Sequence, residues 1–258
     1  MRKGNKMNFF DRLSKQIGNL KEALSKDLFQ DLFLLGLWNT LKIAVLGLLI
    51  GILIGTVIAV IKVAPKYKWF MRFLDKLCDI YVAIFRGTPM IVQLLIPYYI
   101  ILPLLGVTGV DAVVVGVVVF GMNSGAYVAE IMRGGLNSVD IGQMEAGRAL
   151  GLGYVTTMIK VVIPQAIKNI LPTLGNEFIT LIKETSVLSF ITIRDVYNVI
   201  KNEIAAPSYS QDAGYLLIAL VYIVLILFIT LLIKILEGIL SKSDRRNAKP
   251  SKKAQKSL

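Results

Sequence analysis

The sequence contains no histidine and a single cysteine, Cys78, among its 258 residues. One cysteine cannot form a disulfide within the chain, and zinc sites built from cysteine and histidine lack their ligands. Without histidine, the commonest general base of enzymes is also missing. The sequence therefore excludes much of soluble enzyme chemistry, and we expect no metal site and no catalytic residue.

Long stretches of the chain carry no charge at all. Hydrophobic residues make up 55% of the sequence and its mean hydropathy is +0.66, which indicates a protein that lies in a membrane. The net charge of +12 would suggest nucleic acid binding in a soluble protein. Here the basic residues crowd the termini and one short loop, which favours contact with lipid headgroups and not with nucleic acid.

Four charge-free stretches are each about long enough to cross a hydrocarbon core of roughly 30 Å as a helix. They are Ile43–Ile61, Gly87–Val110, Ala112–Ala129 and Ala213–Ile233. A fifth, at about Val155–Ile182, is interrupted by prolines and charges, so neighbouring helices must satisfy its polar groups. We predict an all-α, polytopic membrane protein with five transmembrane helices.

The stretch before Gly87 leaves the number of spans open. Phe73–Phe85 either forms a sixth short span or extends the helix that begins near Gly87, and we favour one long helix with a break at residues 86–89. Five spans place the termini on opposite sides, with basic Lys62–Lys76 and the basic tail inside, as the positive-inside rule requires. The seven basic residues among residues 1–31 fit six spans better.

The sequence divides into three parts by composition. Residues 1–31 have apolar residues at helical spacing, which predicts an amphipathic helix lying on the membrane surface or packing against the bundle. Residues 32–240 form the membrane domain, in which residues 138–164 connect two spans. Residues 241–258 are polar and basic, and we expect an unstructured flank. No cleavable signal peptide is visible, so the first span is expected to remain as an anchor.

The connection at residues 138–164 has a pattern of its own. Asp140 followed three residues later by Gln143 has the form of a capping box, so a helix is expected to begin near Ile141. Gly151 and Gly153 then end it after about ten residues. A short, polar, capped helix on the basic side of a membrane protein is shaped to dock on a cytosolic partner.

Part of this connection resembles the EAA loop of importer-type ABC transporter permeases. The resemblance lies in Glu145-Ala146-Gly147, in Gly151 after three further residues, and in Pro164. Gly147 stands where that pattern has a second alanine, and it is expected to loosen the docking helix. The stretches Phe85–Leu95, Gly125–Leu152 and Leu181–Ile191 also resemble the polar amino acid uptake subgroup. Together the resemblance covers most of residues 32–240.

The resemblance implies a two-fold dimer of permease subunits, most simply a homodimer, in the cell membrane. It also implies an extracytoplasmic solute-binding protein and cytosolic ATPase subunits that bind ATP and magnesium. The ATPase would receive the docking residues Glu145, Ala146, Gly147, Leu150 and Gly151. In agreement, this sequence contains no phosphate-binding loop motif, so it is expected to hold no cofactor and not to hydrolyse ATP itself.

Polar residues within the spans are costly, and each is a candidate for contact with substrate. Asn123, Tyr127 and Glu130 share one helical face and Glu177, Thr180 and Glu184 another, so two polar stripes are expected to face each other. Glutamates suit an ammonium or guanidinium, while the polar groups near residues 86–93 suit a carboxylate. The substrate-pathway candidates are Glu184, Glu177, Asn123, Tyr127, Thr180, Thr88, Gln93, Arg86 and Ser186.

Several of these candidates have a simpler structural explanation. Glu130 has Arg133 one turn away, and an ordinary ion pair would suffice. Arg86 could anchor at a headgroup while Thr88 and Pro89 only break the helix. Glu184 could read the ammonium that all amino acids share.

Three intramembrane glutamates favour cationic amino acids, namely arginine, lysine and histidine, because a positive side chain would relieve their repulsion. Glutamine or another polar amino acid is the alternative substrate. An ion-coupled secondary transporter is the alternative class, although such a transporter has no ATPase for the docking helix to engage.

Overall fold

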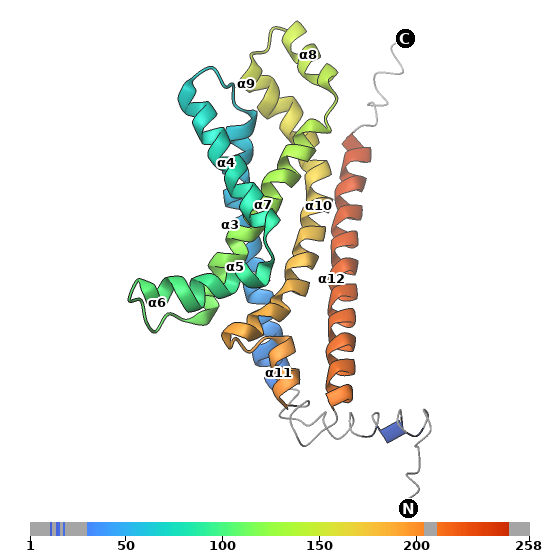
Figure 1. Ribbon diagram of the computed structural model, residues 1–258. Helices are drawn as coiled ribbons and strands as arrows, with labels where there is room; N and C mark the ends of the chain where they lie inside the picture. The colour runs from blue at the N-terminus through green and yellow to red at the C-terminus, as the bar shows by residue number, and fades with distance from the viewer. Residues whose placement is uncertain (1–10, 12–13, 16–17, 19–29, 204–210, 248–258) are drawn as a thin grey trace, which may run out of the picture.

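The structure is a computed structural model that describes residues 11, 14, 15, 18, 30–203 and 211–247, and this part is helical throughout, without strands (Figure 1). The first half contains η1 (Leu32–Leu37), α3 (Trp38–Val63), α4 (Trp69–Gly87), α5 (Met90–Ile96), η2 (Pro97–Ile101), α6 (Leu102–Leu104) and α7 (Ala112–Asn137). The second half contains α8 (Ile141–Ala149), α9 (Tyr154–Thr157), η3 (Met158–Val162), α10 (Ile163–Glu184), η4 (Thr185–Ile191), α11 (Val196–Glu203) and α12 (Gln211–Asn247).

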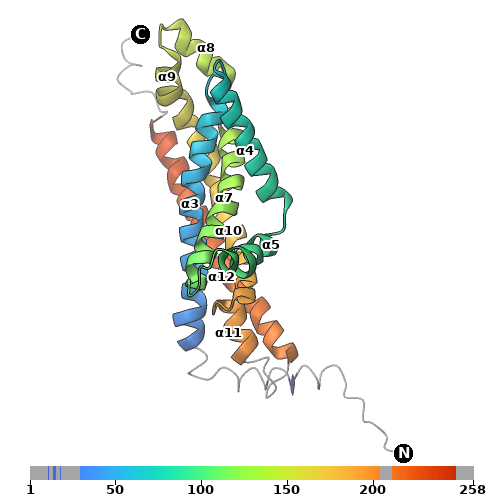
Figure 2. The same ribbon diagram turned by 60° about the vertical axis from the view of Figure 1, so that its left-hand side comes forward.

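The long helices stand side by side as a bundle, as Figure 1 and Figure 2 show. Helices α3, α7 and α12 run toward the end of the bundle that carries α8, and α4 and α10 run the other way. We call these ends the α8 end and the α11 end. Because α3 starts at the α11 end and α12 finishes at the α8 end, the described chain begins and finishes at opposite ends of the bundle.

Helices α3 and α7 form the closest helix pair, and glycines permit it. Gly47, Gly51 and Gly55 recur every four residues along α3 and face α7. A Cβ atom on Gly51 would lie 2.6 Å from the Ser124 hydroxyl, so only glycine fits there. On α7, Gly121 faces α3 in the same way. This is the small-residue packing by which membrane helices approach each other without a hydrophobic driving force.

Helix α10 completes the centre of the bundle and α12 stands at its edge. Helix α10 continues directly from α9 and the π-helical turn η3, so Pro164 near its start and Pro172 in its interior each remove an N–H donor from the helix. Ile179, Leu181 and Ile182 pack from α10 into the main core with Phe120 of α7. Only 11% of the most apolar window of α12 is buried, so most of this helix faces outward.

Three helices in the described part are long and apolar enough to span a membrane by themselves: Leu34–Val63, Ala112–Asn137 and Gly214–Ile239. The pair Trp69–Gly87 and Met90–Leu104 meets this criterion only when taken together. Helix α10, at the expected fifth span, crosses the bundle but does not meet the criterion, because it is the stretch with prolines and charges. The membrane-spanning, all-helical class is confirmed, whereas the count of five stays a prediction.

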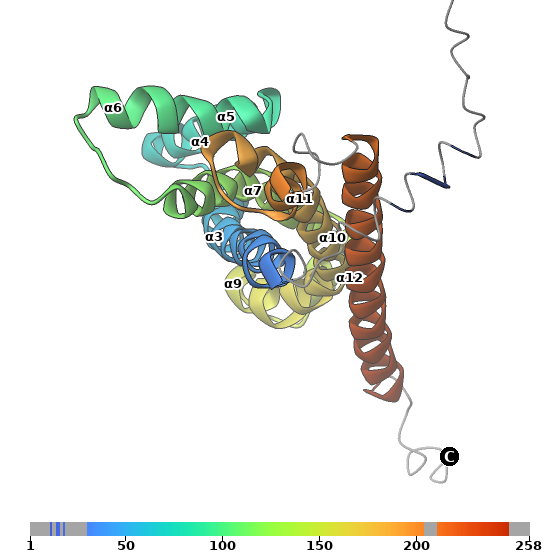
Figure 3. The same cartoon turned by 90° about the horizontal axis from the view of Figure 1, so that it is seen from below.

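The expectation of one long broken helix at residues 73–110 was right about the break and wrong about the path. The two arms meet at 105°, and α5, η2 and α6 extend sideways from the bundle, so Gly87–Val110 is not one straight crossing (Figure 3). Thr88 and Pro89 are both extended, and Pro89 has no N–H to continue the helix. The break therefore follows from the residues of this motif.

The predictions for the two ends of the chain can be compared with the structure only in part. The predicted amphipathic helix within residues 1–31 falls mainly outside the described residues. At the other end, α12 continues as far as Asn247 and so includes the first seven residues of the expected tail, 241–247.

Candidate functional site

Helix α8 forms the tip of the α8 end and has the predicted bounds (Figure 1). The Asp140 carboxylate accepts a hydrogen bond from the Gly142 N–H at 2.7 Å, which caps the first turn. Gly151, with φ +79°, ends the helix in the left-handed conformation, and the Leu152 N–H reaches back to the Gly147 carbonyl at 3.0 Å. Hydrogen bonds thus fix both ends of α8.

The reciprocal half of the capping box is absent. The Gln143 side chain accepts a hydrogen bond from Gln165 of α10 at 3.1 Å, and this contact ties α8 to α10. Glu145, Ala146 and Leu150 are exposed, and Leu150 is 80% accessible to solvent. Ile141 at the start of α8 is exposed as well, at 75%, and large apolar side chains exposed on a tip are typical of a surface that a partner covers.

Gly147 is buried against Thr157, the last residue of α9. A Cβ atom there would lie 2.8 Å from the Thr157 hydroxyl and closer still to its methyl group. The expectation was that Gly147 loosens the docking helix. The structure gives it a different role, because its missing side chain lets α8 pack directly on α9.

The break between α4 and α5 is closed by side-chain amides. Gln93 donates through Nε2 to the carbonyl oxygens of Phe85 and Thr88, at 2.8 and 3.0 Å, and to the Thr88 hydroxyl at 2.8 Å. Asn123 of α7 in turn donates to the Gln93 Oε1 at 2.8 Å. These three substrate-pathway candidates are therefore engaged in satisfying carbonyls that the break leaves without helical partners.

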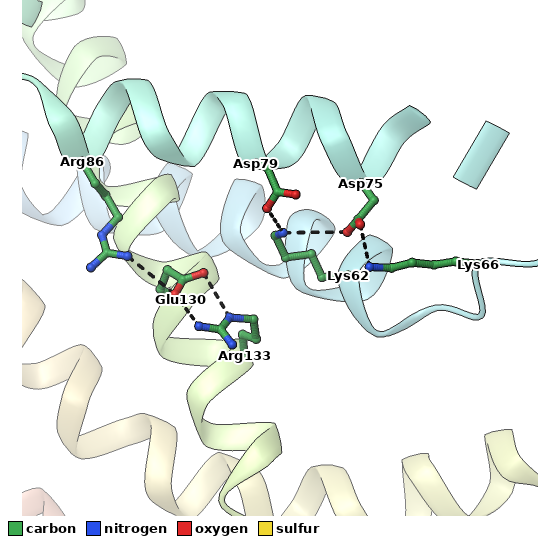
Figure 4. A network of polar contacts seen from close by, with 7 residues as sticks. All are labelled: Lys62, Lys66, Asp75, Asp79, Arg86, Glu130 and Arg133. Atoms are coloured by element: carbon green, nitrogen blue, oxygen red, sulfur yellow. Dashed lines mark hydrogen bonds and ion pairs between the residues drawn. The ribbon is translucent and has the colours of Figure 1, made fainter. Parts of the chain in front are cut away.

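Arg86 completes a charged cluster between α4 and α7 (Figure 4). Arg133 binds the Glu130 carboxylate with two nitrogens, at 3.1 and 2.7 Å, and Arg86 approaches it from α4 at 3.5 Å. The Arg86 guanidinium also lies over the Tyr127 ring, 5.4 Å from its centre. The intrahelical pairing expected for Glu130 is present, and Arg86 and Tyr127 are occupied by each other.

A second ionic cluster closes the hairpin between α3 and α4 (Figure 4). Lys62 pairs with Asp79 and approaches Asp75 at 3.7 Å, and Lys66 binds Asp75 at 2.5 Å. Both clusters join α4 to its neighbours, and both have mixed charge. Helix α4 is thus held to α3 at its start and to α7 at its end.

Glu177 is the most deeply buried of the predicted candidates on α10, with 8% of its surface exposed. The Ser124 hydroxyl of α7 donates to its Oε1 at 3.0 Å. The α7 residues Asn123, Tyr127 and Glu130 turn toward α4 and α5, so the two predicted stripes do not face each other. Only Glu177 meets α7, and it does so through a serine that the sequence reasoning did not select.

The other α10 candidates lie further outward. Thr180 is exposed and its hydroxyl donates to the Asn176 carbonyl in its own helix at 3.1 Å. Glu184 is half-buried at the last position of α10, where the chain tightens into the 3₁₀ helix η4, and Ser186 follows with its hydroxyl on the Lys183 carbonyl. Within the part of the chain that the structure describes, no side chain forms a hydrogen bond or an ion pair with the Glu184 carboxylate.

Asp195 is a buried carboxylate that sequence reasoning missed. It lies at the α11 end, outside the spans, and accepts hydrogen bonds from the N–H groups of Tyr197 and Asn198 at 3.1 and 3.0 Å, so it caps α11. Its side chain is fully enclosed, and burial raises its pKa to about 7. An aspartate directly before a helical segment is an ordinary N-cap pattern that could have identified it.

Comparison with known proteins places these features in a family. Residues 47–242 match the family described as the binding-protein-dependent transport system inner membrane component. The chain is 38% identical to the arginine transport system permease protein ArtQ of Bacillus subtilis, over 81% of this chain and 92% of that protein. It is 36% identical to the putative glutamine transport system permease protein GlnP of Rickettsia bellii, over 77% and 88%.

A solved structure agrees with these relatives. The crystal structure of an amino acid ABC transporter with histidines matches 90% of this chain and 99% of its own, with a TM-score of 0.70 and 35% identity. The resemblance inferred from the sequence is confirmed by both kinds of comparison. The chain belongs to the family of inner membrane components of binding-protein-dependent transport systems, among the permeases of amino acid ABC transporters.

Proposed function

We propose that this chain is the permease subunit of an ATP-driven importer of cationic amino acids, in which two copies form the passage through the cell membrane. The assignment of cationic substrates rests on Glu184, a half-buried carboxylate that forms no ion pair within the described part of the chain. A lysine or arginine side chain would neutralise it, whereas an acidic substrate would add repulsion. Glu177, two turns earlier on the same face of α10, adds negative charge to the same helix.

The similarity to an arginine permease agrees with this assignment. The similarity to putative glutamine permeases is almost as high, so glutamine is the alternative substrate of the same importer. An ion-coupled secondary transporter is disfavoured, because a capped and protruding α8 would then have nothing to engage. The exposed Leu150 and Glu145 of α8 suit a cleft on an ATPase subunit.

In this proposal the ATPase subunits bind ATP and magnesium, and an extracytoplasmic solute-binding protein delivers the amino acid. The α8 end is then cytosolic and the α11 end extracytoplasmic. Docking of α8 moves the chain as a lever, since a packed helix transmits a shift to its neighbours. This chain contributes the passage and the docking helix, and the ATPase contributes the hydrolysis.

The test is isothermal binding of arginine, lysine, histidine, glutamine and glutamate to the purified permease–ATPase complex without the solute-binding protein. We expect saturable binding of the cationic amino acids that Glu184→Gln abolishes. Glu237→Gln on α12 is the matched control, because it makes the same change away from α10, and it should bind like the wild type. Binding of glutamine alone would overturn the cationic assignment.

A further inference from the structure

One hollow of the described part of the molecule is an apolar groove near the α8 end. Its volume is about 520 Å³, within the roughly 300–1,000 Å³ of typical small-ligand sites. Helix α3 forms one wall with Thr56 and Val60, α7 forms the floor with Met132, and α9 and α10 form the other wall with Tyr154 and Leu171. The groove thus lies where three helices of the bundle meet.

The groove offers almost no hydrogen-bonding group to an occupant. The Thr56 hydroxyl is already used, because it donates to the Ile52 carbonyl at 2.6 Å and lies 3.3 Å from the Met132 sulfur. The remaining lining is aliphatic except for Tyr154. A polar substrate would find no partner here, so an occupant must be a hydrocarbon.

The groove opens on the side of the molecule away from α4 and α5. In Figure 3, α9 and the start of α10 lie on the far side of α3 from those helices. On this side α3 presents exposed Leu53, Val57 and Val60, which are 60% or more accessible. An outward face of large aliphatic residues on a membrane helix is suited to lipid chains.

Basic residues border the groove at the α8 end. Lys160 is exposed and lies in η3 between the lining residues Met158 and Ile163, toward the α8 end of the α9–α10 wall. Lys68 follows the lining residue Pro65 by three residues in the hairpin, whereas Lys66 between them is already bound to Asp75. Lysines near the edge of an apolar surface are the arrangement that meets an anionic headgroup.

We propose that this groove binds one acyl chain of an anionic phospholipid whose headgroup is held by Lys160. The lipid would join α3 to the α9–α10 segment that follows the docking helix. With the orientation of the proposed function, the site faces the cytosolic leaflet, which carries negative surface potential. The binding itself does not depend on that orientation or on the substrate, so its test is independent of the proposed function.

A second copy of this chain fits the groove less well than a lipid. A two-fold contact with its axis at the groove would bring the same surface of both copies together, and therefore the same basic border at the same depth. Like charges brought together in this way oppose the contact. The lipid instead supplies the opposite charge at that border.

The test is native mass spectrometry of the intact permease–ATPase complex after exchange into dioleoyl phosphatidylglycerol or dioleoyl phosphatidylcholine at equal concentration. Val60→Trp fills the groove, and Leu53→Trp two turns away on the same face of α3 is its matched control. Lys160→Gln removes the proposed headgroup contact, and Lys201→Gln at the α11 end is the control for charge.

The wild type should retain phosphatidylglycerol about fivefold better than phosphatidylcholine, as expected for one lysine beside an anionic headgroup. Val60→Trp should lose the retained lipid and Leu53→Trp should keep it, while Lys160→Gln alone should lose the preference for phosphatidylglycerol. Equal retention of both lipids by the wild type, or equal loss in both tryptophan variants, would overturn the proposal. Separation of the two permease copies in Val60→Trp would also overturn it, by showing that the second copy fills the groove.

Discussion

The contact between Gly147 and Thr157 makes Gly147→Ala a sharp test of how α8 is held. Alanine is the better helix former by about 1 kcal/mol, so this change would stabilise α8 if nothing touched the new methyl group. The structure instead places the new Cβ 2.8 Å from the Thr157 hydroxyl, inside a contact that is already buried. We therefore expect Gly147→Ala to displace α8 from α9.

The magnitude follows from two matched positions. Gly134 on α7 has nothing within 4 Å of an added Cβ, so Gly134→Ala reports the helix-forming gain alone. Overpacking of a well-packed contact costs about 1–3 kcal/mol. Gly147→Ala should then melt roughly 2–12 °C below Gly134→Ala, at about 2–4 °C per kcal/mol for a chain of this size.

Thr157→Ala should rescue the defect. It removes the methyl and hydroxyl groups and leaves Thr157 Cβ as the nearest atom, 3.1 Å from the added Cβ, which a small shift accommodates. The assay is thermal unfolding in detergent together with amino acid uptake per ATP hydrolysed in proteoliposomes. Gly147→Ala should lower both, and the double variant should restore both toward the wild type. If Gly147→Ala melts as high as Gly134→Ala with unchanged coupling, α8 does not pack on α9 as described.

Three other predictions concern buried polar groups. Ser124→Ala leaves the buried Glu177 carboxylate without its hydrogen-bond donor and should cost about 1–3 kcal/mol of unfolding free energy. Glu177→Gln keeps an acceptor for Ser124 and should therefore melt within a few degrees of the wild type. Burial raises the pKa of Asp195 from 3.8 to about 7. The stability contributed by the protonated carboxyl is therefore complete below about pH 4 and is lost as the pH rises through 7. The fall in melting temperature over that range should be smaller in Asp195→Asn. Gln93→Leu removes the donor of the Thr88 carbonyl and leaves the Phe85 carbonyl only the longer bond from Asn123 at 3.4 Å, so it should cost about 1–3 kcal/mol, seen as a lower melting temperature and slower uptake; an unchanged melting temperature would show that water replaces the amide.

The docking helix was the best predicted element because its determinants are local. Asp140 caps it and Gly151 ends it in any context that permits a helix, so its bounds could be predicted from spacing alone. The break at Thr88-Pro89 was predicted for the same reason. The 105° angle between its arms was not, because it depends on amides contributed by Gln93 and by the distant Asn123.

The facing of the polar stripes was predicted wrongly because helical spacing shows which residues share a face and not which helix that face meets. Gly47, Gly51 and Gly55 contained the missing information, since small residues at this spacing mark a close helix pair. They place α3 on one side of α7. The polar residues of α7 are then left to face α4 and α5, which is where Asn123 and Glu130 find their partners.

Helix α7 connects the docking element to the rest of the bundle. It leads into α8 through three residues, and the Ser138 hydroxyl in this link accepts a hydrogen bond from Asn169 of α10 at 2.7 Å. Along its length α7 holds the helix break through Asn123 and α10 through Ser124. A displacement of α8 therefore reaches both the break and the helix that ends at Glu184 without crossing a flexible segment. Packed interfaces move as units and do not deform continuously. In the proposed function, the polar contacts of α7 are therefore the part of this permease best placed to link docking of α8 with the passage.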